Sequence, residues 1–139
     1  MKYLIDTNVL SELVKKKPNT QVLNWFKELP DSSLYLSVLT IGEIRKGVEK
    51  MPLSKRRQGL VNWLENDLRN WFGKRILSID VALAESWGSM LARADRPLPA
   101  IDSLIAATAT WHGCILVTRN VKDFKGFLDL EVLNPFDEV

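Results

Sequence analysis

Short apolar runs alternate along this chain with longer segments that carry apolar residues every three or four positions. The runs lie at 2–5, 34–39, 76–79, 115–117 and 130–133. Runs of this length without a polar face are typical of strands buried in a parallel sheet. We therefore expect a central sheet of four to five short strands.

The segments between these runs have helical spacing. The second run is expected to give way to its helix at Thr40, and the longest helix to begin at Ser54 and end at Gly73. Helices are expected over the apolar stripes at 9–14, 22–29, 41–48, 60–72 and 83–91, and over the small-residue segment 100–112.

Helices of about ten or more residues between strands imply parallel pairing through right-handed crossovers. Helices then cover both faces of the sheet. The pattern predicts an α/β fold, a three-layer α/β/α sandwich with a central, mostly parallel sheet. With 139 residues, 46% of them hydrophobic, the chain is expected to form one domain.

Acidic residues follow several of the expected strands, at the edge where parallel sheets bind ligands. Asp6 closes the first run, Glu43 lies one turn into the helix after the second run, and Asp102 begins the small-residue helix. Asn120 and Asp123 follow the fourth run. Four segments thus bring oxygen ligands to one edge.

Each acid also has an ordinary structural explanation. Asp6 is placed as a helix N-cap, Glu43 ends a capping box that begins at Thr40, and Asp102 suits the positive end of its helix. Asp123 is placed to cap a short turn. Taken together, however, two carboxylates about 4 Å apart repel by roughly 4 kcal/mol at an effective dielectric near 20, so such a cluster needs a cation or raised pKa values.

Composition narrows the chemistry of that cluster. One cysteine and one histidine exclude a disulfide framework, a four-ligand zinc site of nitrogen and sulfur, and mechanisms that need two imidazoles. Ligation by oxygen alone fits Mg²⁺ or Mn²⁺. No apolar run approaches the roughly 20 residues of a membrane span, and Asp6 comes too early for a signal peptide, so we expect a cytoplasmic protein without membrane partners.

A net charge of +2 is too small to indicate nucleic-acid binding by itself. Positive charge is nevertheless clustered, and an ordinary solvated face is the alternative explanation for each cluster. The candidate RNA contacts are Arg45, Lys46, Lys55, Arg56, Arg57 and Arg119.

Four segments stand out as motifs: YLIDTNVL at 3–10, SVLTIGEIRKG at 37–47, DSLIAATA at 102–109 and VTRNVKDF at 117–124. Together with NPF at 134–136, they resemble the PIN-domain toxins of the VapC and FitB type over nearly the whole chain. The resemblance implies a PIN-like α/β/α sandwich and a single PIN domain over residues 1–139.

The same resemblance implies an activity and partners. Members of this family are Mg²⁺-dependent endoribonucleases, in which Mn²⁺ can substitute, and they inhibit translation by cutting structured RNA such as tRNA. Each is the toxin of a type II toxin–antitoxin pair. The implied partners are a small cognate antitoxin, RNA, a second copy of the chain in a homodimer, and a toxin–antitoxin hetero-oligomer.

By motif position, Asp6, Glu43 and Asp102 match the family's acidic triad and metal ligands. Asp6 and Asp102 are expected to bind the metal directly, and Glu43 through water or as the group that orients the nucleophile. The sequence departs from the FitB-like pattern at Asn120, where an aspartate is expected, so Asp123 is the candidate for the fourth acid. Supporting hydrogen bonds are expected from Thr7, Asn8, Thr118 and Asn120.

Four other functions compete with this interpretation. A phosphoacceptor receiver-like signalling domain also gathers aspartates at strand ends, but it needs adjacent acids where Thr7 and Asn8 stand. A haloacid-dehalogenase-like phosphatase needs an acid at Asn8. A catalytically silent RNA-binding module of the same fold has no need of the intact acidic triad, and cleavage of DNA stays open.

Overall fold

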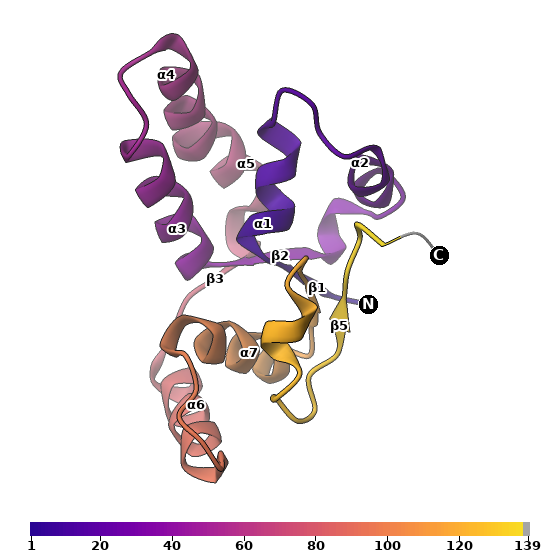
Figure 1. Ribbon diagram of the computed structural model, residues 1–139, viewed down its shortest axis with the longest axis vertical. Helices are drawn as coiled ribbons and strands as arrows, with labels where there is room; N and C mark the ends of the chain where they lie inside the picture. The colour runs from indigo at the N-terminus through magenta and orange to yellow at the C-terminus, as the bar shows by residue number, and fades with distance from the viewer. Residues whose placement is uncertain (138–139) are drawn as a thin grey trace.

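The computed structural model describes residues 1–137, and its centre is a five-stranded sheet in which every neighbouring pair is parallel. The strand order is β3-β2-β1-β4-β5, so β1 lies in the middle (Figure 1). The expected parallel sheet is confirmed. The strands are β1 Tyr3–Ile5, β2 Leu34–Ser37, β3 Ile76–Leu77, β4 Ile115–Val117 and β5 Val132–Leu133.

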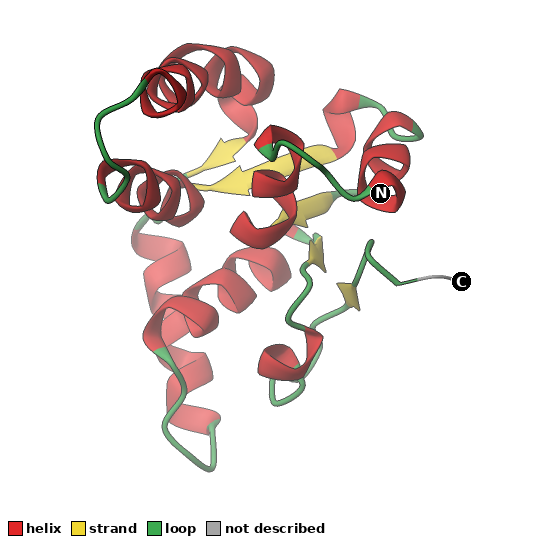
Figure 2. Ribbon diagram, turned by 45° about the horizontal axis from the view of Figure 1, so that its top comes forward, coloured by secondary structure: helices red, strands yellow, loops and turns green. Residues whose placement is uncertain are grey.

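Helices cover both faces of this sheet, which confirms the three-layer α/β/α fold (Figures 1 and 2). The α-helices are α1 Thr7–Leu10, α2 Thr20–Lys27, α3 Val38–Glu49, α4 Lys55–Asn62, α5 Leu68–Phe72, α6 Val81–Arg93 and α7 Ala100–His112. Short 3₁₀ segments are η1 Ser11–Val14, η2 Asp31–Ser33, η4 Gly73–Arg75 and η5 Val121–Phe124, and η3 Trp63–Asp67 is a π-helical turn.

Two apolar cores lie on opposite faces of the sheet. In β1, Leu4 packs with Ile105 of α7, whereas its neighbour Ile5 packs with Phe72 of α5 and the residues of α1 to α3. Successive side chains of a strand point to opposite faces, so a run that is apolar throughout is needed to fill both cores. This is why β1 contains no polar residue before Asp6.

The start of α3 differs from the sequence prediction. The helix begins at Val38, and Ser37 is its N-cap, because the Ser37 hydroxyl oxygen accepts a hydrogen bond from the Leu39 amide at 3.0 Å. Thr40 therefore lies inside the first turn and is buried. The expected capping box from Thr40 to Glu43 does not exist, which removes the ordinary structural explanation for Glu43.

Two expected helices are interrupted. The helix after Asp6 changes from α-helical to 3₁₀ geometry at Ser11. The segment 54–72 contains the π-helical turn η3 between α4 and α5 and ends, as expected, at Gly73, whose φ of 52° suits glycine. Within the described residues no helix is both long enough and apolar enough to span a membrane.

Candidate active site

The carboxyl edge of the sheet brings four chain segments together. Asp6 follows β1, and Thr118 follows β4, its neighbour in the sheet. On the other side of β1, strand β2 leads directly into α3, which carries Glu43 in its second turn. The N-terminus of α7, with Asp102, adds the fourth segment.

Asp6 is partly buried and held through both carboxylate oxygens. Its Oδ1 accepts a hydrogen bond from the Thr7 amide at 2.9 Å, and its Oδ2 accepts one from the Thr118 hydroxyl at 2.7 Å. Asp6 is thus the N-cap of α1, as the structural explanation held. Burial nevertheless raises its pKa above the ordinary value against both hydrogen bonds, and the charge of Asp123 raises it further.

Thr118 is fully buried beside Asp6 and takes part in several hydrogen bonds. While its hydroxyl donates to Asp6, the same oxygen accepts hydrogen bonds from the Asn8 side-chain amide at 3.3 Å and the Asn120 backbone amide at 3.1 Å. Asn8 in turn accepts from the Arg119 amide at 3.0 Å. These contacts connect Asn8 and the Asn120 backbone to Asp6 through Thr118.

Glu43 lies exposed on α3, where its Oε1 accepts a hydrogen bond from the Thr7 hydroxyl at 2.7 Å. Thr7 therefore links two of the acids, since its amide donates to Asp6. Glu43 also lines a groove of about 630 Å³ together with Val38, Lys46 and other residues of α3.

Asp102 lies in the first turn of α7 without a cap role, because α7 has no side-chain cap. Within residues 1–137 its carboxylate accepts no hydrogen bond. Burial raises the pKa of Asp102, and the charges of Asp123, Asp6 and Glu43 raise it further, in that order. Acids from three other segments therefore act on the Asp102 carboxyl group.

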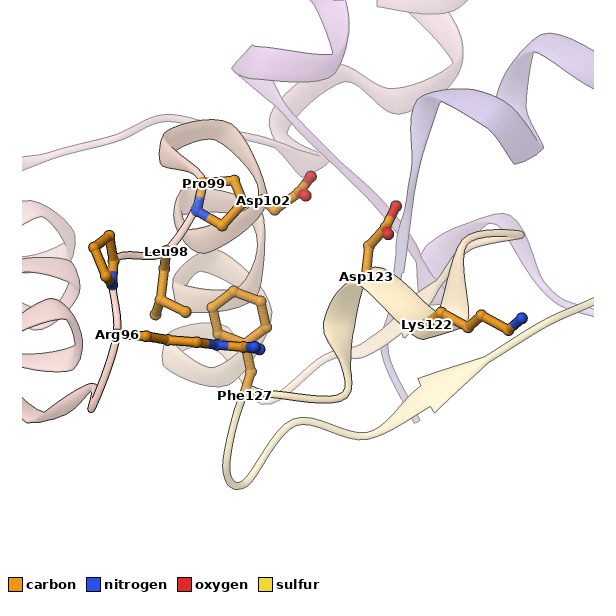
Figure 3. Close-up of a pocket in the computed structure, with 8 residues that line it drawn as sticks. Arg96, Leu98, Pro99, Asp102, Lys122, Asp123 and Phe127 are labelled. Carbon is orange, nitrogen blue, oxygen red and sulfur yellow. The ribbon is translucent and has the colours of Figure 1, made fainter.

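Asp123, in η5, is exposed, and its carboxylate caps no turn in the described structure. It lines one cavity with Asp102, which reaches toward it from α7 (Figure 3). Asn120 contributes its backbone amide to the network, but its side chain makes no hydrogen bond to a described residue. The geometry thus joins Asp123, rather than the Asn120 side chain, to the acidic group.

The donor set of this group is entirely oxygen. In the part of the chain that the structure describes, no three His, Cys, Asp or Glu side chains are arranged to hold a metal ion by themselves. The charges of Asp6, Glu43 and Asp123 all oppose the ionisation of Asp102, and that of Asp123 opposes the ionisation of Asp6. A divalent cation whose shell is completed by water or substrate oxygens fits such a donor set.

Most of the candidate RNA contacts have partners within the protein. Arg45 pairs with Glu65 at 2.7 Å and with Glu49 at 3.7 Å. Arg56 and Arg57 donate to backbone carbonyl oxygens.

The remaining candidates differ in their surroundings. The Arg119 guanidinium lies 4.4 Å from the centre of the Phe136 ring. Lys46 lines the groove beside Glu43, and Lys55 is exposed in the first turn of α4. Lys46 therefore shares this groove with a site acid.

Sequence reasoning missed two features. Glu12 is buried and paired with Lys15 at 2.9 Å, and nothing in its local pattern indicates burial. Arg96 lines the cavity of Asp102 and Asp123 from the segment before α7. A basic residue just ahead of the helix that carries Asp102 was the available signal.

Comparison with known proteins gives consistent results. Residues 3–127 match the PIN domain family. The VapC ribonuclease Y4jK of Sinorhizobium fredii is 35% identical over 96% of this chain and 97% of its own length. The toxin FitB of Neisseria gonorrhoeae is 33% identical over 97% of this chain and 99% of its own length.

Two further proteins extend the comparison. The tRNA(fMet)-specific endonuclease VapC of Shigella flexneri is 29% identical over 90% of this chain and 91% of its own length. A solved structure of FitAB bound to the IR36 DNA fragment contains a chain with a TM-score of 0.88 and 32% identity, covering 99% of this chain and 97% of that one.

Proposed function

This chain belongs to the PIN-domain family, and from that membership we propose that it is a metal-dependent endoribonuclease, the toxin of a type II toxin–antitoxin pair. The observation that carries the proposal is the gathering of four acids at one edge of the sheet. The charges of Asp123, Asp6 and Glu43 all raise the pKa of Asp102. Acids that oppose one another's ionisation suit a cation site better than a set of helix caps.

We assign the cation as Mg²⁺, with Mn²⁺ as a substitute, because every donor is a carboxylate oxygen. Asp6 and Asp102 are the direct ligands in this proposal, Asp123 adds negative charge beside them, and Glu43 acts through water. When bound, the cation supplies activation of water and offsets the charge of the scissile phosphate.

The chain's own residues prepare this chemistry. Thr118 and the Thr7 amide fix the two oxygens of Asp6, so its carboxylate has one orientation before any ligand arrives. The Thr7 hydroxyl holds Oε1 of Glu43, and Oε2 of Glu43 has no partner among the described residues. That second oxygen is available to orient the attacking water and to accept its proton.

A receiver-like signalling domain is excluded by topology. Receiver domains have the flavodoxin-like strand order 2-1-3-4-5. This chain has the order β3-β2-β1-β4-β5. The crossovers therefore place different segments at the carboxyl edge, and the acids of the two folds are not equivalent.

The partners in this proposal follow from the family. A cognate antitoxin forms a hetero-oligomer with the toxin, and two copies of the toxin form a homodimer. The antitoxin is expected to insert a cationic side chain, most simply arginine, among the acids, because a guanidinium forms bidentate pairs with carboxylates. The substrate is structured RNA such as tRNA, which places the action in the cytoplasm.

A cleavage assay tests the proposal. Antitoxin-free protein is incubated with bulk tRNA in Mg²⁺ or Mn²⁺, with excess EDTA, and with metal restored after EDTA. Cleavage should require the metal and return with it. An Asp102→Asn preparation purified in parallel controls for contaminating nucleases. Cleavage that persists in EDTA would overturn the metal dependence, and RNA binding without cleavage would identify a silent binding module.

A further inference from the structure

A cavity of about 330 Å³ opens beside the acidic group, and Asp102 and Asp123 form part of its wall (Figure 3). Its volume lies at the small end of the range for pockets that bind small molecules. None of its other residues belongs to the network around Asp6. The cavity therefore adjoins the candidate active site and is available for part of a substrate.

Part of the wall of this cavity is apolar. Leu98, Pro97 and Pro99 come from the segment that leads into α7, and the buried Phe127 comes from the segment after η5. An aromatic ring among apolar side chains can accept the face of an unpaired nucleic-acid base, whose edge stays in water.

Arg96 supplies a positive charge at the same place. An alanine Cβ at Gly126 would lie 2.7 Å from its Nη2, so the guanidinium rests against the backbone of the segment opposite its own. Within residues 1–137 Arg96 forms neither a hydrogen bond nor an ion pair, even though two acids line the same cavity. Its donors are therefore available to a ligand, and a phosphate matches their geometry.

Lys122 also lines the cavity, but it differs from Arg96 in direction. In Figure 3 its side chain points away from Arg96 and from the two acids. The two residues carry the same charge and belong to one cavity. Lys122 is therefore a matched control for Arg96, since only the Arg96 side chain lies across the cavity.

From these observations we infer that the cavity is a nucleotide subsite, which holds the unpaired RNA nucleotide next to the cleaved bond. The base packs against Leu98, Phe127 and the prolines, and Arg96 binds the phosphate of that nucleotide. The guanidinium also offsets the repulsion between this phosphate and the nearby carboxylates. The inference rests on the proposed ribonuclease function and adds a specificity-determining site to it.

Binding of RNA that resists cleavage tests this subsite apart from catalysis. The probe is a fluorescein-labelled octamer of 2′-O-methyl RNA with randomised bases, measured by fluorescence anisotropy in Mn²⁺. The second probe is an octamer of the same backbone without bases. The proteins are the full-length wild type, Arg96→Ala, Lys122→Ala and Gly126→Ala.

We expect Arg96→Ala to weaken binding of the octamer about tenfold, as for the loss of a charge-assisted hydrogen-bonded pair. Lys122→Ala should weaken it by about twofold or less. Gly126→Ala keeps every charge and needs no positive φ, but its methyl group displaces the guanidinium, so a loss of a few fold is expected. The octamer without bases should bind more weakly to wild type than the RNA probe.

Equal losses for Arg96→Ala and Lys122→Ala would indicate general charge attraction and overturn the subsite, as would equal binding of the two probes. Cleavage by the wild type is measured in parallel on bulk tRNA. If the wild type cleaves and the variants bind alike, the subsite is wrong and the ribonuclease stands. If the binding differences appear without cleavage, the cavity binds a nucleotide, but the proposed ribonuclease function and the place of the cavity beside a cleaved bond are wrong.

Discussion

Glu12 and Asp102 are two carboxylates whose surroundings shift their pKa values in opposite directions. Burial acts to raise the pKa of Glu12, but Lys15, the Asn19 amide and the charge of Arg119 lower it below the ordinary value. Oε1 of Glu12 accepts from Asn19 at 2.8 Å, and Oε2 pairs with Lys15. Asp102 has no such partner, and burial and three other acids raise its pKa.

The difference separates a structural acid from the acid that we propose as functional. Both carboxylate oxygens of Glu12 have partners within the chain, and the hydrogen bond from Asn19 joins η1 to the start of α2. The acids around Asp102 form no ion pair with a described residue, and their charges oppose one another's ionisation. Such a group gains stability only when a cation arrives from outside.

The largest expected effect is on catalysis. Asp102→Asn should lower the rate of RNA cleavage by at least about 100-fold, because the loss of a direct ligand removes several kcal/mol of transition-state stabilisation. Glu12→Gln should cleave at close to the wild-type rate. Single-turnover rates of tRNA cleavage measure both effects. A similar loss of rate in both variants would show that the two acids do not differ in function.

Stability should show the reverse order. Glu12→Ala should lower the free energy of unfolding by about 2 kcal/mol, since it leaves the Asn19 amide without its acceptor. Metal-free Asp102→Asn should be no less stable than wild type, with a gain of at most about 1 kcal/mol, because water screens this partly exposed side chain. Urea unfolding in EDTA measures the two values. A clear loss in Asp102→Asn would mean that Asp102 is a structural residue.

The pH dependence of these differences should have opposite signs. Glu12 has a lowered pKa, so its stabilisation is present above the ordinary value of 4.5 and is lost as the pH falls through its folded-state pKa. Asp102 has a raised pKa, so its destabilisation is absent below 3.8 and grows as the pH rises through the folded-state value.

Urea unfolding of wild type, Glu12→Gln and Asp102→Asn from pH 3 to pH 7 in EDTA checks these signs. The advantage of wild type over Glu12→Gln should shrink on acidification. The higher stability of Asp102→Asn relative to wild type should also disappear on acidification. If wild type minus variant changed with pH in the same direction for Glu12→Gln and for Asp102→Asn, the assigned environments would be contradicted.

The smallest effect concerns the fourth acid. Asp123→Asn should raise the Mg²⁺ concentration for half-maximal cleavage a few fold, and Asn120→Asp should lower it, because each changes the negative charge around the cation by one. Metal titrations of the cleavage rate give these midpoints. An unchanged midpoint in Asp123→Asn would remove Asp123 from the site and leave Asp6, Glu43 and Asp102.

The sequence specifies some of this structure strongly. Helix α7 and strand β4 occur at the predicted bounds, because Pro97 and Pro99 precede the helix and Gly113, with φ of 67°, ends it. The meeting of Asp6 with the segment that follows β4 was predictable as well, since the carboxyl ends of adjacent parallel strands share one edge.

Other features depend on tertiary packing and were not predictable. Ser37 and Thr40 are both good N-cap residues, and the apolar residues between them suit a strand or a helix, so local pattern does not place the start of α3. The burial of Glu12 and the contact of Arg96 with Gly126 join segments through the fold. No spacing in the sequence records such contacts.

The most direct test of the central claim is the thermal midpoint of unfolding as Mn²⁺ is added to protein stripped with EDTA. If the acids await a cation, Mn²⁺ should raise the midpoint of wild type and of Glu12→Gln by similar amounts and leave Asp102→Asn nearly unchanged. No rise in wild type, or an equal rise in Asp102→Asn, would contradict the account of these acids as a metal site.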